Sequence, residues 1–193
     1  EGAGRVEKVG ANVRGISPGD AVLLSFTSCG ACAACVSVHP AYCETWLPRN
    51  LLGGLRADGS GGISRDGEPV AGHFFGQSSF GTHAIADERS VVRVAGDADL
   101  TVLAPLGCGV LTGFGSMWNV LDPGPTDIVA VYGAGAVGLS AVIAASLREP
   151  VQLIAVDRVA SRLDLALELG ATAVVDASSE DVVARLAELA GGR

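Results

Sequence analysis

Ile128-Val-Ala-Val-Tyr-Gly-Ala-Gly-Ala-Val-Gly-Leu139 is the stretch of this 193-residue chain that decides its fold. The continuous apolar run over residues 128–132 is typical of a strand buried on both faces of a parallel sheet. Gly133, Gly135 and Gly138 follow at Gly-x-Gly-x-x-Gly spacing. The first glycine permits a tight turn, the second lets backbone approach a pyrophosphate, and the third lets the next helix pack on the strand. The stretch therefore predicts a strand, a glycine turn and a helix.

The residues beyond the glycines complete a candidate dinucleotide site. We expect a helix over residues 137–146, whose N-terminus would face an anion bound at the turn. A second apolar run, residues 151–156, ends at Asp157, nineteen residues after Gly138. A carboxylate there can accept hydrogen bonds from both ribose hydroxyls and would repel a 2′-phosphate, which favours NAD over NADP. The alternative is an ordinary strand-turn-helix without a ligand, and the terminal aspartate favours the NAD site.

The rest of the C-terminal part predicts two further units of the same kind. Leucines alternate over residues 162–170 as in a strand, but the helix formers around them and Gly170 as the residue after a helix end favour a helix. A strand at 173–176 and a helix at 181–190 would follow. Three strand-helix units make half of a doubly wound parallel sheet.

The N-terminal part is predicted to be rich in β-structure. Residues 1–28 alternate glycine with β-branched residues, as in a small barrel or sandwich. Residues 53–72 predict a surface loop or hairpin with turns at Asp58-Gly59 and Asp66-Gly67, and residues 74–94 are β-like. Residues 100–121 look helical in two pieces broken around 107–109. We therefore expect two domains, residues 1–99 and 100–193.

Four of the five cysteines are spaced two, two and seven residues apart and lie within residues 29–43. Four thiolates this close suit a closed tetrahedral zinc site, with Cys29, Cys32, Cys35 and Cys43 as ligands. Buried thiols or disulfides are the alternatives, but the glycine and alanines between the cysteines are too small to build a core. Such a site has no open coordination position, so we expect a structural zinc. His39 lies inside the segment, and the four cysteines leave it no role as a ligand.

Cys108 stands alone between glycines in Gly107-Cys108-Gly109-Val110-Leu111-Thr112-Gly113. On composition, a buried thiol packed as a small hydrophobic residue is the simpler interpretation. The glycines, however, let backbone approach a ligand, and the segment joins the two predicted domains, where substrate sites commonly form.

Composition and charge limit the possible functions. Hydrophobic residues make up 49% of the chain, which is ample for a core, and the net charge of −8 argues against nucleic acid as a partner. No uninterrupted apolar stretch approaches the roughly twenty residues that cross a bilayer, and the chain starts without a signal-peptide pattern. We expect a cytoplasmic protein with no membrane partner. Neither end resembles a natural terminus, so we expect a piece of a longer enzyme.

Together these motifs resemble the zinc-dependent medium-chain alcohol dehydrogenases over nearly the whole chain. Residues 1–10 resemble the Gly-His-Glu-x-x-Gly-x-Val segment of that family, starting one residue after its zinc-binding histidine. The cysteines at 29–43 match its structural zinc loop. Residues 107–113 are similar to the segment whose cysteine binds the catalytic zinc and whose threonine contacts the nicotinamide. The pattern of residues 74–82 and the loop 58–67 most resemble the aryl- and benzyl-alcohol dehydrogenase branch.

The resemblance implies an α/β chain made of a partial, β-rich GroES-like catalytic domain and a partial Rossmann domain that binds NAD. It implies that Cys108 binds a catalytic zinc, that Glu1 lies behind this zinc, and that Thr112 contacts the nicotinamide. For the cofactor it implies Thr112, Gly133, Ala134, Gly135, Ala136, Val137, Gly138, Asp157 and Arg162. The family's other catalytic zinc ligands have no match among the 193 residues. A homo-oligomer is expected for the full-length protein.

The function expected from the resemblance is the reversible oxidation of a primary, aromatic alcohol to an aldehyde, with hydride transfer to NAD. One alternative is a formaldehyde dehydrogenase that oxidises a hydroxymethyl-thiol. Another is a non-catalytic fragment that binds zinc and NAD, because Cys108 alone cannot hold a catalytic zinc.

Overall fold

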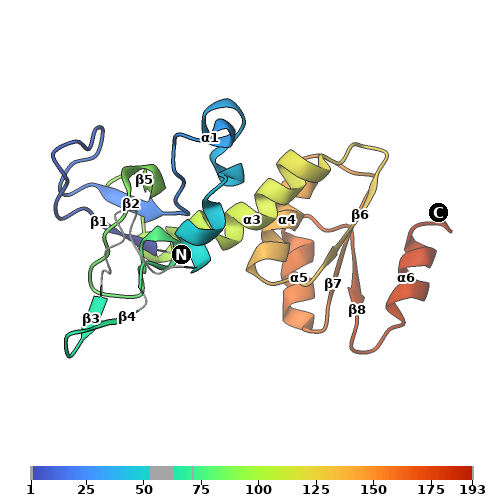
Figure 1. Ribbon diagram of the computed structural model, residues 1–193. Coiled ribbons are helices and arrows are strands. Elements are labelled where there is room, and N and C mark those ends of the chain that lie inside the picture. Colours follow the sequence, from blue (N-terminus) through green and yellow to red (C-terminus); the bar gives the residue numbers. More distant parts are fainter. Residues whose placement is uncertain (1, 53–62, 71, 193) are drawn as a thin grey trace. The chain divides into compact units, whose positions relative to one another are not determined.

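A computed structural model describes residues 2–52, 63–70 and 72–192 (Figure 1). By internal contacts the chain forms two compact units, Glu1–Cys108 and Gly109–Arg193.

The first unit contains a three-stranded antiparallel sheet in the order β1-β2-β5. Its strands are β1 (Gly2–Arg5), β2 (Ala21–Leu24) and β5 (Val91–Arg93). Ala21, Val22 and Leu23 of the central strand are buried, because β2 is paired on both sides. The expected short strands in residues 1–28 are confirmed.

Of two segments of the first unit that were predicted to contain β-structure, one agrees with its prediction and the other does not. The expected hairpin is present as β3 (Ile63–Arg65) and β4 (Glu68–Val70), joined by Asp66 and Gly67, both with positive φ. The turn expected at Asp58-Gly59 lies outside the described residues. The β-structure expected over 74–94 is wrong for most of that range, because only β5 is a strand. Residues 74–76 form a 3₁₀ turn instead.

The remaining elements of the first unit are short helices. They are α1 (Ala33–Ser37), the 3₁₀ helices Pro40–Tyr42, Phe74–Gly76, Glu88–Ser90 and Ala104–Gly107, the π-helix Pro48–Leu52 and α2 (Leu100–Leu103). The division into units falls after Cys108, later than the domain boundary expected at residues 99 and 100. It does so because α2 packs against β1 and β2, and the following 3₁₀ helix packs against the same strands.

The second unit is a parallel sheet in the order β6-β7-β8 with its connecting helices. The strands are β6 (Ile128–Tyr132), β7 (Gln152–Asp157) and β8 (Ala173–Asp176). The helices are α3 (Gly109–Gly115), the π-helix Ser116–Leu121, α4 (Ala136–Ser146), α5 (Ala160–Glu168) and α6 (Val182–Leu189). This order confirms the predicted strand-helix units and the expected break in the helical stretch 100–121.

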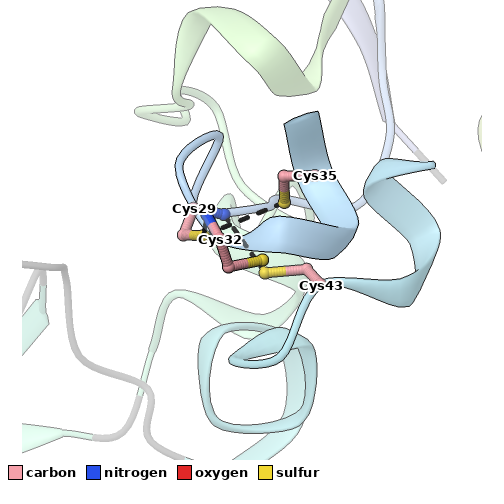
Figure 2. A group of neighbouring side chains, drawn as sticks. All are labelled: Cys29, Cys32, Cys35 and Cys43. Atoms are coloured by element: carbon pink, nitrogen blue, oxygen red, sulfur yellow. Dashed lines mark hydrogen bonds between the residues drawn. The ribbon is translucent and has the colours of Figure 1, made fainter. Parts of the chain in front are cut away.

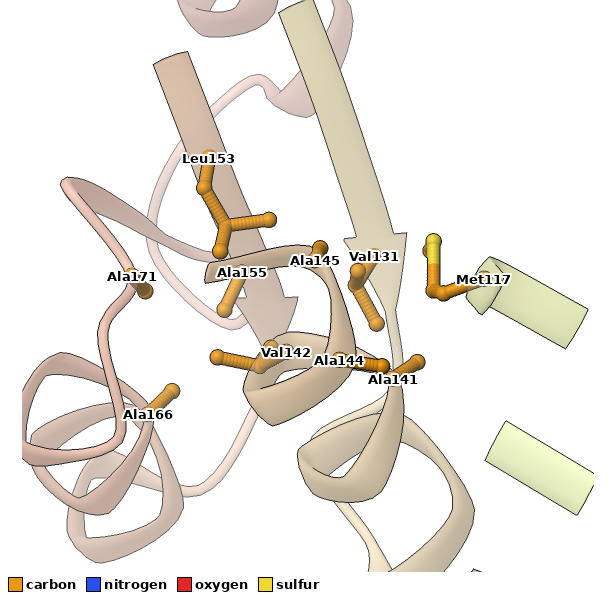
Figure 3. Packing of buried hydrophobic residues seen from close by; sticks show 10 residues of the cluster. All are labelled: Met117, Val131, Ala141, Val142, Ala144, Ala145, Leu153, Ala155, Ala166 and Ala171. Carbon is orange, nitrogen blue, oxygen red and sulfur yellow. The ribbon is translucent and has the colours of Figure 1, made fainter. Parts of the chain in front are cut away.

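Small side chains on α4 allow it to lie close to the sheet (Figure 3). Val142, Ala144 and Ala145 are fully buried, and Leu153 and Ala155 of β7 belong to the same cluster. The prediction that β6 is buried on both faces is wrong. Ala130 and Tyr132, which share one face, are exposed, Tyr132 by 66%, whereas Val131 on the other face is buried.

The segment 162–170 is helical, as predicted, although its leucines alternate. Leu163 and Ala166, three residues apart, are the buried positions of α5. Gly170 follows the helix with φ of +112°, and Ala171 N–H donates to the Ala166 carbonyl at 2.9 Å. This is the glycine-terminated helix end that the sequence indicated.

Within the described ranges no single helix is long and apolar enough to cross a membrane. Among the described residues, the bent pair Leu100–Gly107 and Gly109–Leu121 passes the same test by length and composition alone, when its two parts are taken together.

Candidate functional site

The four clustered cysteines converge in one lobe, which we call the cysteine lobe, residues 29–43 (Figure 2). Cys32 caps α1, Cys35 lies in that helix, and Cys43 follows the 3₁₀ helix Pro40–Tyr42. All four sulfurs lie within 4.8 Å of one another. The geometry therefore brings together every residue predicted to bind the structural zinc.

The sulfur spacing fits a zinc ion. A tetrahedral ion with Zn–S bonds of about 2.3 Å separates its sulfurs by about 3.8 Å. The Cys29 and Cys35 sulfurs are 3.8 Å apart. His39 is excluded from the cluster and instead accepts a hydrogen bond from Ala41 N–H through Nδ1 at 3.2 Å.

Backbone N–H groups prepare part of the lobe for a cation. Gly30 has φ of +70°, and the turn it makes aims the N–H groups of Ala31 and Cys32 at the Cys29 sulfur, at 3.4 and 3.2 Å. These donors lower the pKa of Cys29 to about 6. Desolvation, with the neighbouring Cys32 thiol next in size, raises the pKa of Cys35 to about 11. The lobe thus favours a thiolate at Cys29, and a cation is needed to hold four thiolates together.

The last cysteine of the lobe is buried. Burial by itself would raise the pKa of Cys43, but hydrogen bonds from the Thr45 hydroxyl and the Cys29 N–H outweigh it, and its pKa is lowered. The Thr45 oxygen lies 3.4 Å and the Cys29 nitrogen 3.3 Å from the Cys43 sulfur.

The glycine turn, residues 133–138, has the geometry that its sequence predicted. Gly133 has φ of +88°, and its N–H donates to the Val156 carbonyl at 2.7 Å, which fixes the turn to β7. A Cβ on Gly138 would collide with the Gly133 carbonyl, so this position requires glycine for the approach of helix and turn. Gly135 caps α4 and has no side chain to occupy the first N–H groups of the helix. Those donors are available to a pyrophosphate.

Asp157 lies at the end of β7 and supports the glycine turn. Its Oδ2 accepts the Ala134 N–H at 2.7 Å, and its Oδ1 accepts the N–H groups of Arg158 and Val159 at 2.7 and 2.9 Å. Arg162 lies 3.9 Å from Oδ2. The Ala134 hydrogen bond, followed by those of Val159 and Arg158 and the charge of Arg162, lowers the pKa of Asp157 against the effect of burial. The carboxylate is therefore ionised at neutral pH.

An open hollow of about 630 Å³ lies beside this aspartate. It is lined by Tyr132, Gly133, Val156, Asp157, Arg158, Val159, Arg162, Ala177 and Ser178. Gly133, Asp157 and Arg162 were predicted for the cofactor. Tyr132, Ala177 and Ser178 were missed, although they lie at or just beyond the carboxyl ends of neighbouring strands, where ligands of parallel sheets bind.

The other predicted cofactor residues lie on α3 and α4. Ala136 and Val137 are exposed in the first turn of α4, whereas Ala134 is only 1% exposed and contributes its backbone. Thr112 is exposed on α3, and its carbonyl accepts the Ser116 hydroxyl at 2.8 Å.

Cys108 lies in the first unit, directly after Gly107, where two backbone segments come close together. A Cβ on Gly107 would collide with the Leu24 carbonyl, and the Ser25 hydroxyl donates to the Gly107 carbonyl at 3.0 Å. The half-buried Cys108 lines a cavity of about 520 Å³, which we call the aromatic cavity. Its lining residues are Leu24, Ser25, Ile63, Phe74, Phe75, Gln77, Ser78, Ser79, Phe80, Gly107 and Cys108. The phenylalanines that line this cavity with Cys108 were not predicted as site residues, because folding brings them to it from another part of the chain. Glu1 lies outside the described residues.

Two family models match the chain. One, described as the alcohol dehydrogenase GroES-like domain, covers residues 1–96, and the other, described as zinc-binding dehydrogenase, covers residues 136–193. They correspond to the β-rich part with the cysteine lobe and to the part that begins at α4.

Individual relatives agree with the family models. Geraniol dehydrogenase of Castellaniella defragrans is 46% identical over 193 residues, which are 100% of this chain and 52% of the relative. S-(hydroxymethyl)glutathione dehydrogenase of Escherichia coli is 36% identical over 94% of this chain and 49% of the relative. The crystal structure of benzyl alcohol dehydrogenase from Acinetobacter calcoaceticus superposes with a TM-score of 0.87 at 42% identity, over 97% of this chain and 50% of that one.

The chain thus spans about half the length of the curated relatives that it matches. Its two units carry the fold, the clustered thiols and the glycine turn expected from its sequence. The chain belongs to the zinc-dependent medium-chain alcohol dehydrogenase family.

Proposed function

We propose that the protein carrying this chain oxidises a primary alcohol with an aromatic or other unsaturated group next to its CH₂OH carbon. The products are the aldehyde and NADH, and the reaction is reversible. The observation that supports this most strongly is that Cys108, the family's candidate zinc ligand, lines a cavity with phenylalanine side chains. Bound zinc would supply a Lewis acid that lowers the pKa of the alcohol hydroxyl, and NAD would supply the hydride acceptor.

The first unit contributes a zinc ligand and a substrate surface. The Cys108 thiolate would be one ligand of the catalytic zinc, and Glu1 is proposed to lie behind the metal. Phe74, Phe75 and Phe80 offer apolar surface to the organic part of the substrate.

The second unit contributes the cofactor site. N–H groups at the start of α4 would bind the pyrophosphate, and Asp157 would accept a hydrogen bond from a ribose hydroxyl. Three N–H groups already bond to this carboxylate, whose two oxygens can accept about four hydrogen bonds, so about one acceptor position remains for the ribose. The negative charge of the carboxylate would repel a 2′-phosphate. The proposal is therefore specific for NAD. Arg162, Thr112 and Val137 are proposed to contact the cofactor, as the family resemblance implies.

The substrate class is supported by the relatives. The names of geraniol dehydrogenase and benzyl alcohol dehydrogenase designate alcohols with a double bond or an aromatic ring beside the CH₂OH group. The S-(hydroxymethyl)glutathione dehydrogenase is less similar, at 36% identity. None of the described residues that line the aromatic cavity is Lys or Arg, which does not favour a substrate with glutathione's carboxylates. The thiol-adduct reaction is therefore not favoured.

Turnover assays test the proposal. The protein is expected to reduce NAD with benzyl alcohol or geraniol at a kcat/KM at least tenfold above that with ethanol, and to use NADP poorly. Cys108→Ala should abolish turnover, whereas Val102→Ala, an exposed change on the neighbouring α2, should leave it unchanged. Full turnover by the Cys108→Ala protein would disprove the assignment. Faster turnover of formaldehyde with glutathione would support the thiol-adduct reaction, and zinc and NAD binding without any turnover would support a non-catalytic binding module.

A further inference from the structure

One wall of the aromatic cavity is formed by a segment with an unusual backbone. Of the six residues 73–78, four have φ in the left-handed region: His73 at 62°, Phe75 at 54°, Gly76 at 71° and Ser78 at 50°. Bulky side chains rarely adopt this region, and such conformations persist only where the surroundings hold them. The position of the Phe75 ring in the cavity wall therefore depends on what packs behind this segment.

Two residues from outside the segment pack against it. Trp46 meets Phe75 edge to face, with ring centroids 5.9 Å apart and an angle of 89° between the planes. Thr27 packs so closely on Gly76 that a Cβ there would lie 2.6 Å from the Thr27 methyl.

Thr27 and Trp46 flank the cysteine lobe. Thr27 precedes Cys29 by two residues, and Trp46 follows Cys43 by three, with its N–H bonded to the Cys43 carbonyl at 2.9 Å. Two of the residues that hold the cavity wall are thus at the two ends of the segment that carries the thiols.

Asn50 ties these two ends together. Its Oδ1 accepts the Thr27 N–H at 2.9 Å, and its Nδ2 donates to the carbonyls of Thr27 and Trp46 at 2.9 and 2.8 Å. The side chain is only 2% exposed, so these hydrogen bonds are shielded from water. A change in the spacing of the lobe ends must therefore move either this network or Phe75.

We propose that Trp46 is a positioning residue that couples the cysteine lobe to the aromatic cavity by holding Phe75 as a wall of that cavity. Metal binding by the four thiols fixes the two ends of the lobe, the Asn50 network fixes Trp46, and Trp46 fixes the ring that contacts the substrate. The lobe then contributes to substrate selection as well as to stability. This inference rests on the proposed function for the identity of the substrate.

Fluorescence provides a test that does not require turnover. The chain has two tryptophans, and Trp118 lies in the second unit, stacked on Phe114. The emission of Trp46 is obtained as the difference between a Trp118→Phe protein and a protein that carries both Trp118→Phe and Trp46→Phe. Removal of zinc from the cysteine lobe should shift that emission, and benzyl alcohol should quench it in the zinc-loaded protein. An emission that responds to neither zinc nor benzyl alcohol would overturn the coupling.

Kinetics of matched variants provide the second test. In the otherwise native protein, Trp46→Leu should raise the KM for benzyl alcohol roughly three- to tenfold, with kcat and zinc content nearly unchanged, because one aromatic contact is lost. Trp46→Phe should restore most of the selectivity for benzyl alcohol over ethanol. Leu47→Ala, at the half-exposed neighbouring residue, is the control.

The outcomes separate the two proposals. Unchanged selectivity in a Trp46→Leu protein that retains its zinc would overturn the coupling while leaving the proposed function intact. If Trp46→Leu does not fold, a Trp46 emission that responds to neither zinc nor benzyl alcohol overturns it by itself. Emission that responds to zinc and benzyl alcohol in a protein that oxidises no alcohol would retain the coupling and reject the proposed function.

Discussion

Asp157 has a structural task in addition to the role in cofactor selection proposed for it. Its side chain is 9% exposed, and its two oxygens accept three backbone N–H groups, one from the glycine turn and two from the start of the next connection. Hydrogen bonding to a ribose does not require these three bonds to backbone N–H groups. The same carboxylate therefore holds the turn in the shape that a dinucleotide requires before any cofactor binds.

Replacing Asp157 with Asn should weaken the second unit. Asparagine has one acceptor oxygen, so its NH₂ group would face either Ala134 N–H or the N–H groups of Arg158 and Val159. We expect a loss of about 1–3 kcal/mol in the free energy of unfolding at pH 7, typical of hydrogen bonds to a charged group. Urea denaturation followed by far-ultraviolet circular dichroism measures it. Asp164→Asn, at an exposed position of α5, is the control and should change little.

The acid dependence of stability should change with the same variant. Because the pKa of Asp157 is lowered on folding, its contribution is fully present above the unfolded value of about 3.9 and is lost as pH falls through the lower, folded value. The difference between the native and Asp157→Asn proteins should therefore shrink below about pH 4. A difference that is constant from pH 7 to pH 2.5 would show that the carboxylate charge is not responsible.

At the scale of elements, α3 and α4 approach each other closely in the second unit. A Cβ on Gly113 would collide with the Val137 carbonyl and lie 2.9 Å from the Ala141 nitrogen. Gly115 lies in the same helix, and the nearest atom to its added Cβ is Asn119 Nδ2 at 3.7 Å. An added methyl group would therefore collide with α4 at Gly113 and would meet no close contact at Gly115.

This pair gives a matched test of helix packing. Gly113→Ala should force α3 and α4 apart and lower the free energy of unfolding by about 1–3 kcal/mol, as overpacked sites do. Gly115→Ala should be neutral or stabilising by up to about 1 kcal/mol, because alanine is the better helix former. Thermal melts of the two variants measure the difference. Equal stability of the two would contradict the packing.

The elements show which features a sequence can predict. The strand β6, the glycine turn and α5 depend on local patterns, and each was predicted, including the helix at 162–170 whose leucines alternate. The β-structure expected over residues 74–94 failed because the left-handed turn around Phe75 depends on Trp46 and Thr27, almost thirty and fifty residues away. Nothing in the pattern around these positions signals that packing.

The candidate site shows the same difference between features set by local sequence patterns and features set by contacts between distant segments. The cysteine lobe and Asp157 were predicted because zinc ligands and the ribose carboxylate recur at fixed spacings along a chain. The phenylalanines of the aromatic cavity and the hydrogen bonds of Asn50 were not predicted. Both bring together residues from distant segments, whose positions follow no fixed spacing along the chain. A single buried asparagine with three backbone partners cannot be distinguished in a sequence from an exposed one.

At the scale of the whole molecule, the two proposed zinc sites differ in kind. The cysteine lobe supplies four thiols from one short segment, so its site is complete and closed, whereas Cys108 is proposed as one of three protein ligands at an open site. A closed site holds its metal far more firmly, since structural zinc contributes roughly 10–16 kcal/mol in small zinc-binding peptides. The two sites should therefore respond differently to mutation and to chelators.

Metal counting tests this difference on the intact protein. The native protein should contain two zinc ions per chain by atomic absorption, and Cys108→Ser should contain one, with its thermal midpoint little changed. Cys43→Ser removes a buried ligand, so it should lose the lobe zinc and melt at a clearly lower temperature. A brief exposure of the native protein to a chelator should remove the open-site zinc first and abolish turnover while Trp46 emission stays constant. Two zinc ions in the Cys108→Ser protein would show that Cys108 is not a ligand, and an unchanged melt of a zinc-depleted Cys43→Ser protein would show that the lobe does not depend on its metal.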